Sequence, residues 1–147
     1  MIEVGNIVYF KNIIFEESKI DHSFNKGRPC VFLGELDNKM YFMPLSNVTT
    51  AKKYHGHHIK PNRENELKKV SHLCIRELLE KPIAWYNFYG YLDDVTLDDI
   101  FDNIYKFHNK IDEDKSRLLI KLYENYISSK KKYIDKDKIN KNNRRNK

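Results

Sequence analysis

The order of its apolar segments constrains the fold of this chain more than any other feature. Short segments rich in β-branched and aromatic residues come first, separated by turn residues such as Gly, Pro, Asn and Asp. They span residues 6–11, 29–34, 40–46 and 71–74. Residues 97–108 and 118–127 instead repeat apolar side chains at helical spacing. Strands followed by helices predict a mainly β (α+β) protein, a small antiparallel barrel or sandwich with C-terminal helices.

The length of 147 residues predicts one principal domain. We expect a barrel domain over 1–110 and an extra C-terminal helix over 111–134 that packs on it. Residues 135–147 are basic and lack an apolar period, which predicts a disordered tail. Thr96 is the predicted N-cap of the first helix, with Asp99 three residues further on.

Charge is distributed unevenly along the chain. The net charge is +6, but residues 128–147 alone carry seven Lys and two Arg against two Asp, so the rest of the chain is near −1. Within that body, residues 49–72 carry six basic against two acidic side chains, whereas residues 92–114 carry two basic against eight acidic. This asymmetry predicts opposite charged faces, with an anionic partner preferred at the first.

Several classes of protein are disfavoured by the sequence. No apolar run approaches the roughly 20 residues of a membrane span, and no secretory leader is visible at the start. Cys30 and Cys74 lie in apolar segments and have no metal-binding spacing. We therefore expect a cytoplasmic protein with reduced thiols, without contact with a membrane.

Two motifs frame the second and third predicted strands. Gly27-Arg28-Pro29 enters the second strand, and Met43-Pro44-Leu45-Ser46 ends the third. A turn at residues 36–39 makes the strands antiparallel neighbours, so Arg28 and Ser46 should lie at the same end of the hairpin. A guanidinium beside a hydroxyl would suit a phosphate, with Arg28 facing a groove and not the core. The alternative is an ordinary surface Arg and a strand-end Ser.

These motifs, together with Gly5-Asn6-Ile7-Val8, His72-Leu73-Cys74-Ile75-Arg76-Glu77-Leu78 and Tyr89-Gly90-Tyr91-Leu92, resemble the PemK/MazF-type toxins of the Kid/MazF superfamily. The resemblance runs from about residue 3 to 108. It implies an SH3-like small antiparallel β-barrel, a homodimer, and an endoribonuclease with Arg28 and Ser46 as the catalytic pair. The chain has Asn6 where the family usually has Asp, and Ser46 where Thr is commoner.

Cleavage by such an enzyme requires neither metal nor cofactor. RNA carries its own nucleophile, the 2′-hydroxyl, which attacks the adjacent phosphate. Arg28 would stabilise the charge that develops there, and Ser46 would donate a hydrogen bond to a phosphate oxygen. Because the pKa of Arg is too high for a general base, the base stays unassigned.

A basic loop supplies candidate contacts to single-stranded RNA, because it interleaves cations with an aromatic ring. The candidate RNA-binding residues are Lys26, Lys52, Lys53, Tyr54, His55, His57, His58 and Lys60. The three histidines could act as acid or base. The alternatives are a solvated loop or a metal site, although no Cys or carboxylate partner for a metal is evident. The aromatic segment 85–91 could stack bases, fill the core or form a dimer contact.

The sequence therefore predicts a toxin endoribonuclease, similar to mRNA interferases, that an antitoxin neutralises. A protein antitoxin is the first expectation. Two alternatives stay open. One is a related toxin restrained by an RNA antitoxin, and the other is a non-catalytic RNA-binding SH3-like module.

Overall fold

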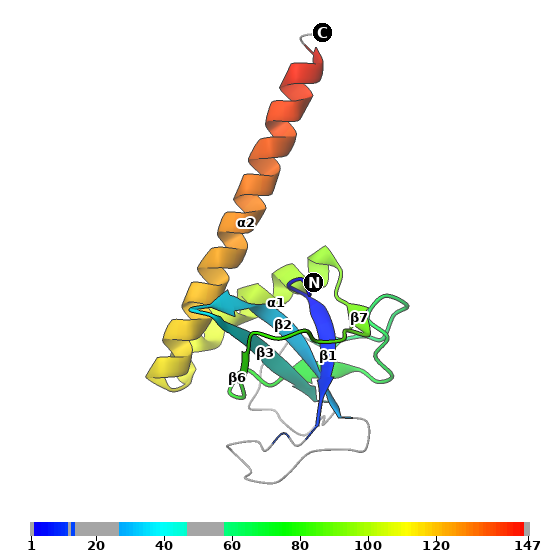
Figure 1. The fold of residues 1–147 in the computed structure, drawn as a ribbon, viewed down its shortest axis with the longest axis vertical. Coiled ribbons are helices and arrows are strands. Elements are labelled where there is room, and N and C mark those ends of the chain that lie inside the picture. The colour runs from blue at the N-terminus through cyan, green and yellow to red at the C-terminus, as the bar shows by residue number, and fades with distance from the viewer. Residues whose placement is uncertain (1, 12, 14–26, 47–57, 146–147) are drawn as a thin grey trace.

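A curled antiparallel sheet, followed by two C-terminal helices, forms the body of the protein (Figure 1). The computed structural model describes residues 2–11, 13, 27–46 and 58–145, the side chains of 132–145 excepted. The half-barrel sheet and the helices confirm the predicted mainly β (α+β) class. No helix within these residues is both long and apolar enough to cross a bilayer.

Three consecutive strands form the centre of the sheet: β1 (Asn6–Phe10), β2 (Arg28–Leu36) and β3 (Lys39–Ser46). β2 and β3 pair directly through a two-residue turn in which Asp37 and Asn38 have φ values of 49° and 63°. Asx residues adopt this left-handed conformation at low cost, and it matches the twist of a hairpin. The predicted hairpin is therefore confirmed.

β3 has different partners along its length on the side away from β2. Its first half pairs with β6 (Leu79–Pro82), and its last residues pair with β5 (Ser71–Leu73). β5 in turn pairs with β4 (His58–Ile59), and β7 (Gly90–Tyr91) pairs with the outer edge of β1. Because the two halves of β3 pair with different strands along this edge, the sheet curls around β3.

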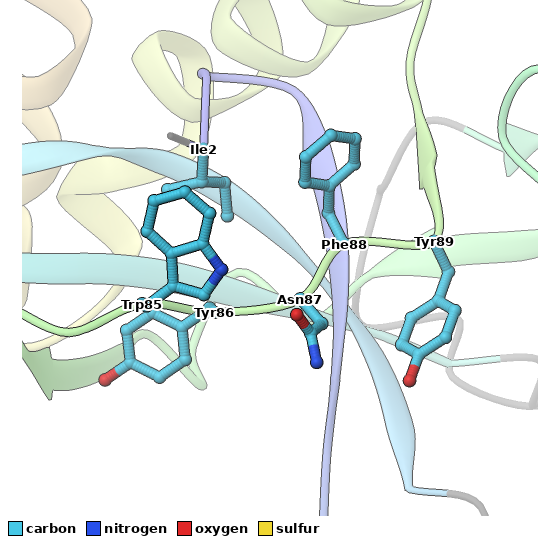
Figure 2. A pocket seen from close by; sticks show the side chains of 6 residues that line it. All are labelled: Ile2, Trp85, Tyr86, Asn87, Phe88 and Tyr89. Atoms are coloured by element: carbon cyan, nitrogen blue, oxygen red, sulfur yellow. The ribbon is translucent and has the colours of Figure 1, made fainter.

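The segment between β6 and β7, residues 83–89, crosses one face of the sheet (Figure 2). Its Tyr86 ring lies edge-on to Phe42 of β3 and Phe10 of β1, at centroid distances of 5.5 and 5.6 Å. Below it, Val8 and Cys30 belong to a buried apolar cluster on this face. This cluster contains no residue of either helix. On this face of the sheet, part of the cover is the crossing segment.

The other face is covered by the helices α1 (Asp94–Phe107) and α2 (Glu113–Arg145), joined by the 3-10 turn η1 (His108–Lys110). The fully buried side chains there come from strands and helices alike. They include Ile7, Val31, Leu33, Met43, Ile100, Phe101, Ile104, Leu119 and Leu122. Gly34 allows the close approach of α2, because a Cβ at this position would lie 3.1 Å from Leu122 Cδ2.

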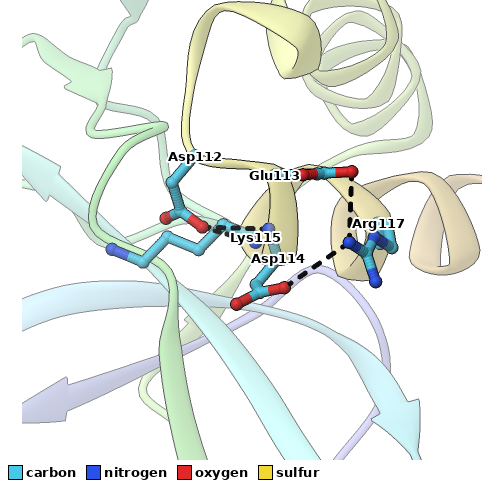
Figure 3. A network of polar contacts seen from close by, with 5 residues as sticks. All are labelled: Asp112, Glu113, Asp114, Lys115 and Arg117. Carbon is cyan, nitrogen blue, oxygen red and sulfur yellow. Dashed lines mark hydrogen bonds and ion pairs between the residues drawn. The ribbon is translucent and has the colours of Figure 1, made fainter.

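The helix starts are set by aspartates. The N-cap of α1 is Asp93 and not the predicted Thr96, because the Asp93 carboxylate accepts the backbone N–H of Thr96 at 2.7 Å. Before α2, Asp112 Oδ1 accepts the N–H groups of Asp114 and Lys115 at 3.0 and 3.1 Å (Figure 3). Arg117 forms exposed ion pairs with Glu113 and Asp114 in the first turn, and such pairs contribute little to the stability of the helix.

The second helix is longer than predicted. The sequence predicts a helix over 111–134 and then a disordered tail, whereas the backbone of α2 is helical to Arg145. No Gly or Pro follows residue 113 to end the helix. In Figure 1 its C-terminal part projects away from the sheet.

We predict that α2 is an integral part of the core. Leu122→Ala should lower the free energy of unfolding by about 2–5 kcal/mol, because it opens a cavity between α2 and the sheet. Val95→Ala is the control; Val95 is 73% exposed on α1, so its truncation should change stability by less than about 0.5 kcal/mol. Urea unfolding measures both. Equal midpoints for the two variants would show that α2 contributes nothing to the core.

Candidate functional site

Arg28 and Ser46 lie at the same end of the β2–β3 hairpin. Cys30 is the register partner of Pro44, so two residues further along each strand Arg28 comes opposite Ser46. Arg28 Nη1 donates a hydrogen bond to the carbonyl oxygen of Leu45 at 3.1 Å. The structure therefore brings together the two residues that the sequence selected.

Arg28 is nevertheless buried, with only 4% of its surface exposed, and Ser46 is 6% exposed. The sequence analysis expected Arg28 to face a groove and not the core, whereas its side chain is buried. A guanidinium can be buried where polar groups receive its N–H donors, and the Leu45 carbonyl is one of them. Burial lowers the pKa of Arg28, which the nearby Cys74 and Cys30 thiols partly oppose. Arg28 still keeps its proton at any working pH.

Two histidines extend this pair across the sheet. His72 of β5 is the register partner of Ser46 on one side and of His58 of β4 on the other. Directly opposite residues of antiparallel strands point to the same face, with Cβ atoms about 4.5–5.5 Å apart. One line of residues thus crosses four strands, and we call it the Arg28–His58 row. It consists of Arg28, Ser46, His72 and His58.

The electrostatics of the row favour a neutral His72. His72 is 6% exposed, and burial lowers its pKa below the ordinary value; the nearby His58 and Arg28 lower it further. A neutral imidazole has one nitrogen that accepts a proton. The sequence analysis did not identify His72 as a candidate acid or base. Its signal, a strand pairing that places it between Ser46 and His58, becomes visible only in the folded sheet.

The structure describes only part of the predicted RNA-binding set. His58 is exposed on the edge strand β4 and belongs to the row, and Lys60 is exposed just after that strand. Lys26, Lys52, Lys53, Tyr54, His55 and His57 lie outside the described residues. Arg63 and Lys69, which the sequence analysis did not select, are exposed in the segment between β4 and β5.

The candidate metal ligands and thiols at this end of the sheet are described only in part. Among the residues that the structure describes, no three His, Cys, Asp or Glu side chains are grouped so that they could hold a metal ion. Cys30 lies beside Arg28 but is fully buried, and burial raises its pKa far above the ordinary value. A buried, protonated thiol is a poor nucleophile.

Comparison of the sequence with protein-family models and with curated proteins finds no match.

We predict that His72 has a pKa below about 6.5. Its imidazole should titrate at a lower pH than an ordinary histidine in an NMR titration, and His58→Gln should raise the pKa of His72, because His58 is one of the groups that lower it. Because folded His72 holds its proton less tightly than the unfolded chain, the free energy of unfolding should fall as pH decreases below about 6.5. His72→Gln should weaken that dependence. A pKa at or above the ordinary value would contradict the arrangement.

Proposed function

We propose that this protein is an endoribonuclease of the toxin–antitoxin type, which cleaves single-stranded RNA without a metal. The observation that carries the proposal is the Arg28–His58 row. A fixed cation, a hydroxyl and a neutral imidazole lie side by side on one sheet face. These are the groups that transphosphorylation of RNA needs, and the motifs around Arg28 and Ser46 resemble those of PemK/MazF-type toxins.

Each group has a role in the proposed reaction. His72 accepts the proton of the 2′-hydroxyl, whose oxygen then attacks the adjacent phosphorus. Arg28 stabilises the charge on the phosphate oxygens, and Ser46 donates a hydrogen bond to one of them. The bond from phosphorus to the 5′-oxygen breaks and that oxygen takes up a proton, leaving a cyclic phosphate and a 5′-hydroxyl. Exposed His58 marks the end of the row that is open to solvent.

The substrate and the partners follow from the charge around β4. His58, Lys60, Arg63 and Lys69 are exposed in β4 and in the segment between β4 and β5, which also exposes Glu64 and Glu66. The cations there would neutralise RNA phosphates. We propose that an acidic protein antitoxin, or an RNA antitoxin in the alternative, competes for the same surface. We also propose that the curled sheet is an SH3-like barrel, and that the chain acts as a cytoplasmic homodimer.

One observation favours a second candidate function. Arg28 and Ser46 are both buried. A buried pair could hold the hairpin end together while the exposed basic residues bind RNA, which would make the protein a non-catalytic RNA-binding module. Cleavage assays separate the two candidates.

We predict that purified protein cuts single-stranded RNA in the presence of EDTA. The products should carry a cyclic phosphate and a 5′-hydroxyl, because the 2′-oxygen is the nucleophile. End-labelled fragments, with and without phosphatase treatment, identify these ends. Cleavage that disappears in EDTA and returns with a divalent ion would contradict the metal-independent mechanism.

Substitutions in the row should then rank by the strength of the hydrogen-bond donors that they remove. Arg28→Ala and Arg28→Lys should both slow cleavage, the first by about 10²–10³, because Lys lacks the planar fork of donors. Ser46→Ala should cost less, and Ser46→Thr should be nearly silent. His72→Gln should remove the acidic limb of the pH–rate profile, in which the rate rises as His72 loses its proton. Thermal melting of each variant controls for folding. A folded, fully active Arg28→Ala protein would exclude this site.

A further inference from the structure

A cavity of about 320 Å³ lies beside the segment that crosses the sheet (Figure 2). It is lined by Ile2, Trp85, Tyr86, Asn87, Phe88 and Tyr89. Trp85 is 78% exposed, Tyr89 57% and Phe88 48%. Trp85 is therefore not part of the core, and the other two side chains are buried only in part. In Figure 2 the Trp85 and Phe88 rings project from one side of the segment, and the side chains of Tyr86, Asn87 and Tyr89 project from the other. Aromatic rings and one amide thus surround a cavity with room for a planar ligand.

The cavity is formed by a segment that is anchored to the sheet at both ends. Tyr86 donates its hydroxyl to the Pro82 carbonyl at 2.8 Å, and its ring packs on Phe10 and Phe42. Tyr89 is held by its N–H, which donates to the Ile7 carbonyl at 2.9 Å, and by an edge-on contact with Tyr9. The Tyr86 and Tyr89 rings are therefore positioned before any ligand arrives, which reduces the entropy cost of binding.

Contacts connect one residue of the cavity lining, Tyr86, with the Arg28 end of the row. Phe10, the register partner of Arg28, lies on the same sheet face as Arg28 and contacts Tyr86. Lys81 of β6 places its ammonium 4.8 Å from the centre of the Phe10 ring. Arg28, the half-buried Phe10 ring and Tyr86 are therefore successive neighbours, with the Lys81 cation beside Phe10.

We propose that this cavity binds a nucleobase of single-stranded RNA whose backbone lies along the row. The aromatic rings stack on the base, the Asn87 amide hydrogen-bonds to its edge, and Lys81 attracts the phosphate between the cavity and the row. Single-stranded RNA is recognised in this way, by stacking on aromatic side chains and by hydrogen bonds to base edges. This inference rests on the proposed function for the position of the backbone.

A second copy of the chain is the rival occupant of the same surface. The cores of protein interfaces are depleted in Lys, whereas Lys81 lies beside Phe10, next to the cavity lining. A lining that includes an amide, with a cation close by, fits a nucleotide better than an apolar protein face. Self-association through this cavity is therefore the alternative result of the experiment below.

Trp85 is the only tryptophan in the chain, so its fluorescence reports on the cavity directly. The probe is a short 2′-O-methyl oligoribonucleotide, which lacks the 2′-hydroxyl and cannot be cut. It should quench Trp85 fluorescence saturably, whereas an abasic strand of equal length should bind without quenching. Asn87→Ala should reduce the difference in affinity between oligonucleotides of different base composition. Lys81→Met should reduce the salt dependence of binding by about one phosphate contact for every oligonucleotide.

Tyr105→Ala is the matched control, since Tyr105 is 57% exposed but lies on α1; it should leave binding and quenching unchanged. Binding seen by fluorescence anisotropy without any quenching of Trp85 would overturn the proposal, and so would the absence of binding at low salt. A blue shift of Trp85 that depends on protein concentration alone, with a doubling of mass, would assign the cavity to a second copy. Quenching by a protein that does not cut unmodified RNA would support the cavity and refute the proposed nuclease.

Discussion

The pairing of β3 determines both the shape of the sheet and the composition of the candidate site. One edge of β3 pairs with β2, while its other edge pairs with β6 near Lys39 and with β5 near Ser46. The curl brings β5 and β4 beside the end of the hairpin, where Ser46 meets His72. The β6 branch starts the segment that crosses to β1. The row and the aromatic cavity thus depend on the same strand.

The parts of the fold that the sequence predicted are those set by local interactions. The central hairpin depends on two Asx residues between two apolar strands, and the helices on apolar side chains at a period of 3.6. The N-cap of α1 was misplaced by three residues, because Asp93 and Thr96 are both good caps and only the backbone geometry distinguishes them. The length of α2 was underestimated because its last residues lack an apolar face, although nothing in them ends a helix.

The candidate site was only half predictable for a related reason. Arg28 and Ser46 belong to one hairpin, so their proximity follows from the turn between them. His72 lies opposite Ser46 only because β5 pairs with the end of β3. Many residues separate these two strands along the chain, and their sequence does not predict the register of the pairing. The burial of Arg28 was also missed. The rule that charges stay exposed holds unless the fold supplies acceptors, and here a strand carbonyl accepts from the guanidinium.

The charge state of the row is itself constrained by burial. Arg28 keeps its proton because even a lowered guanidinium pKa stays far from neutrality. Its charge, together with desolvation, then opposes protonation of His72. The Cys30 thiol stays protonated, because burial outweighs the attraction of the same guanidinium for a thiolate. The buried part of the row therefore holds one positive charge at neutral pH. In the proposed reaction, this single buried cation would match the one negative charge of a phosphodiester. A second cation at His72 would bind the phosphate more tightly but would remove the only group in the row placed to accept a proton beside Ser46.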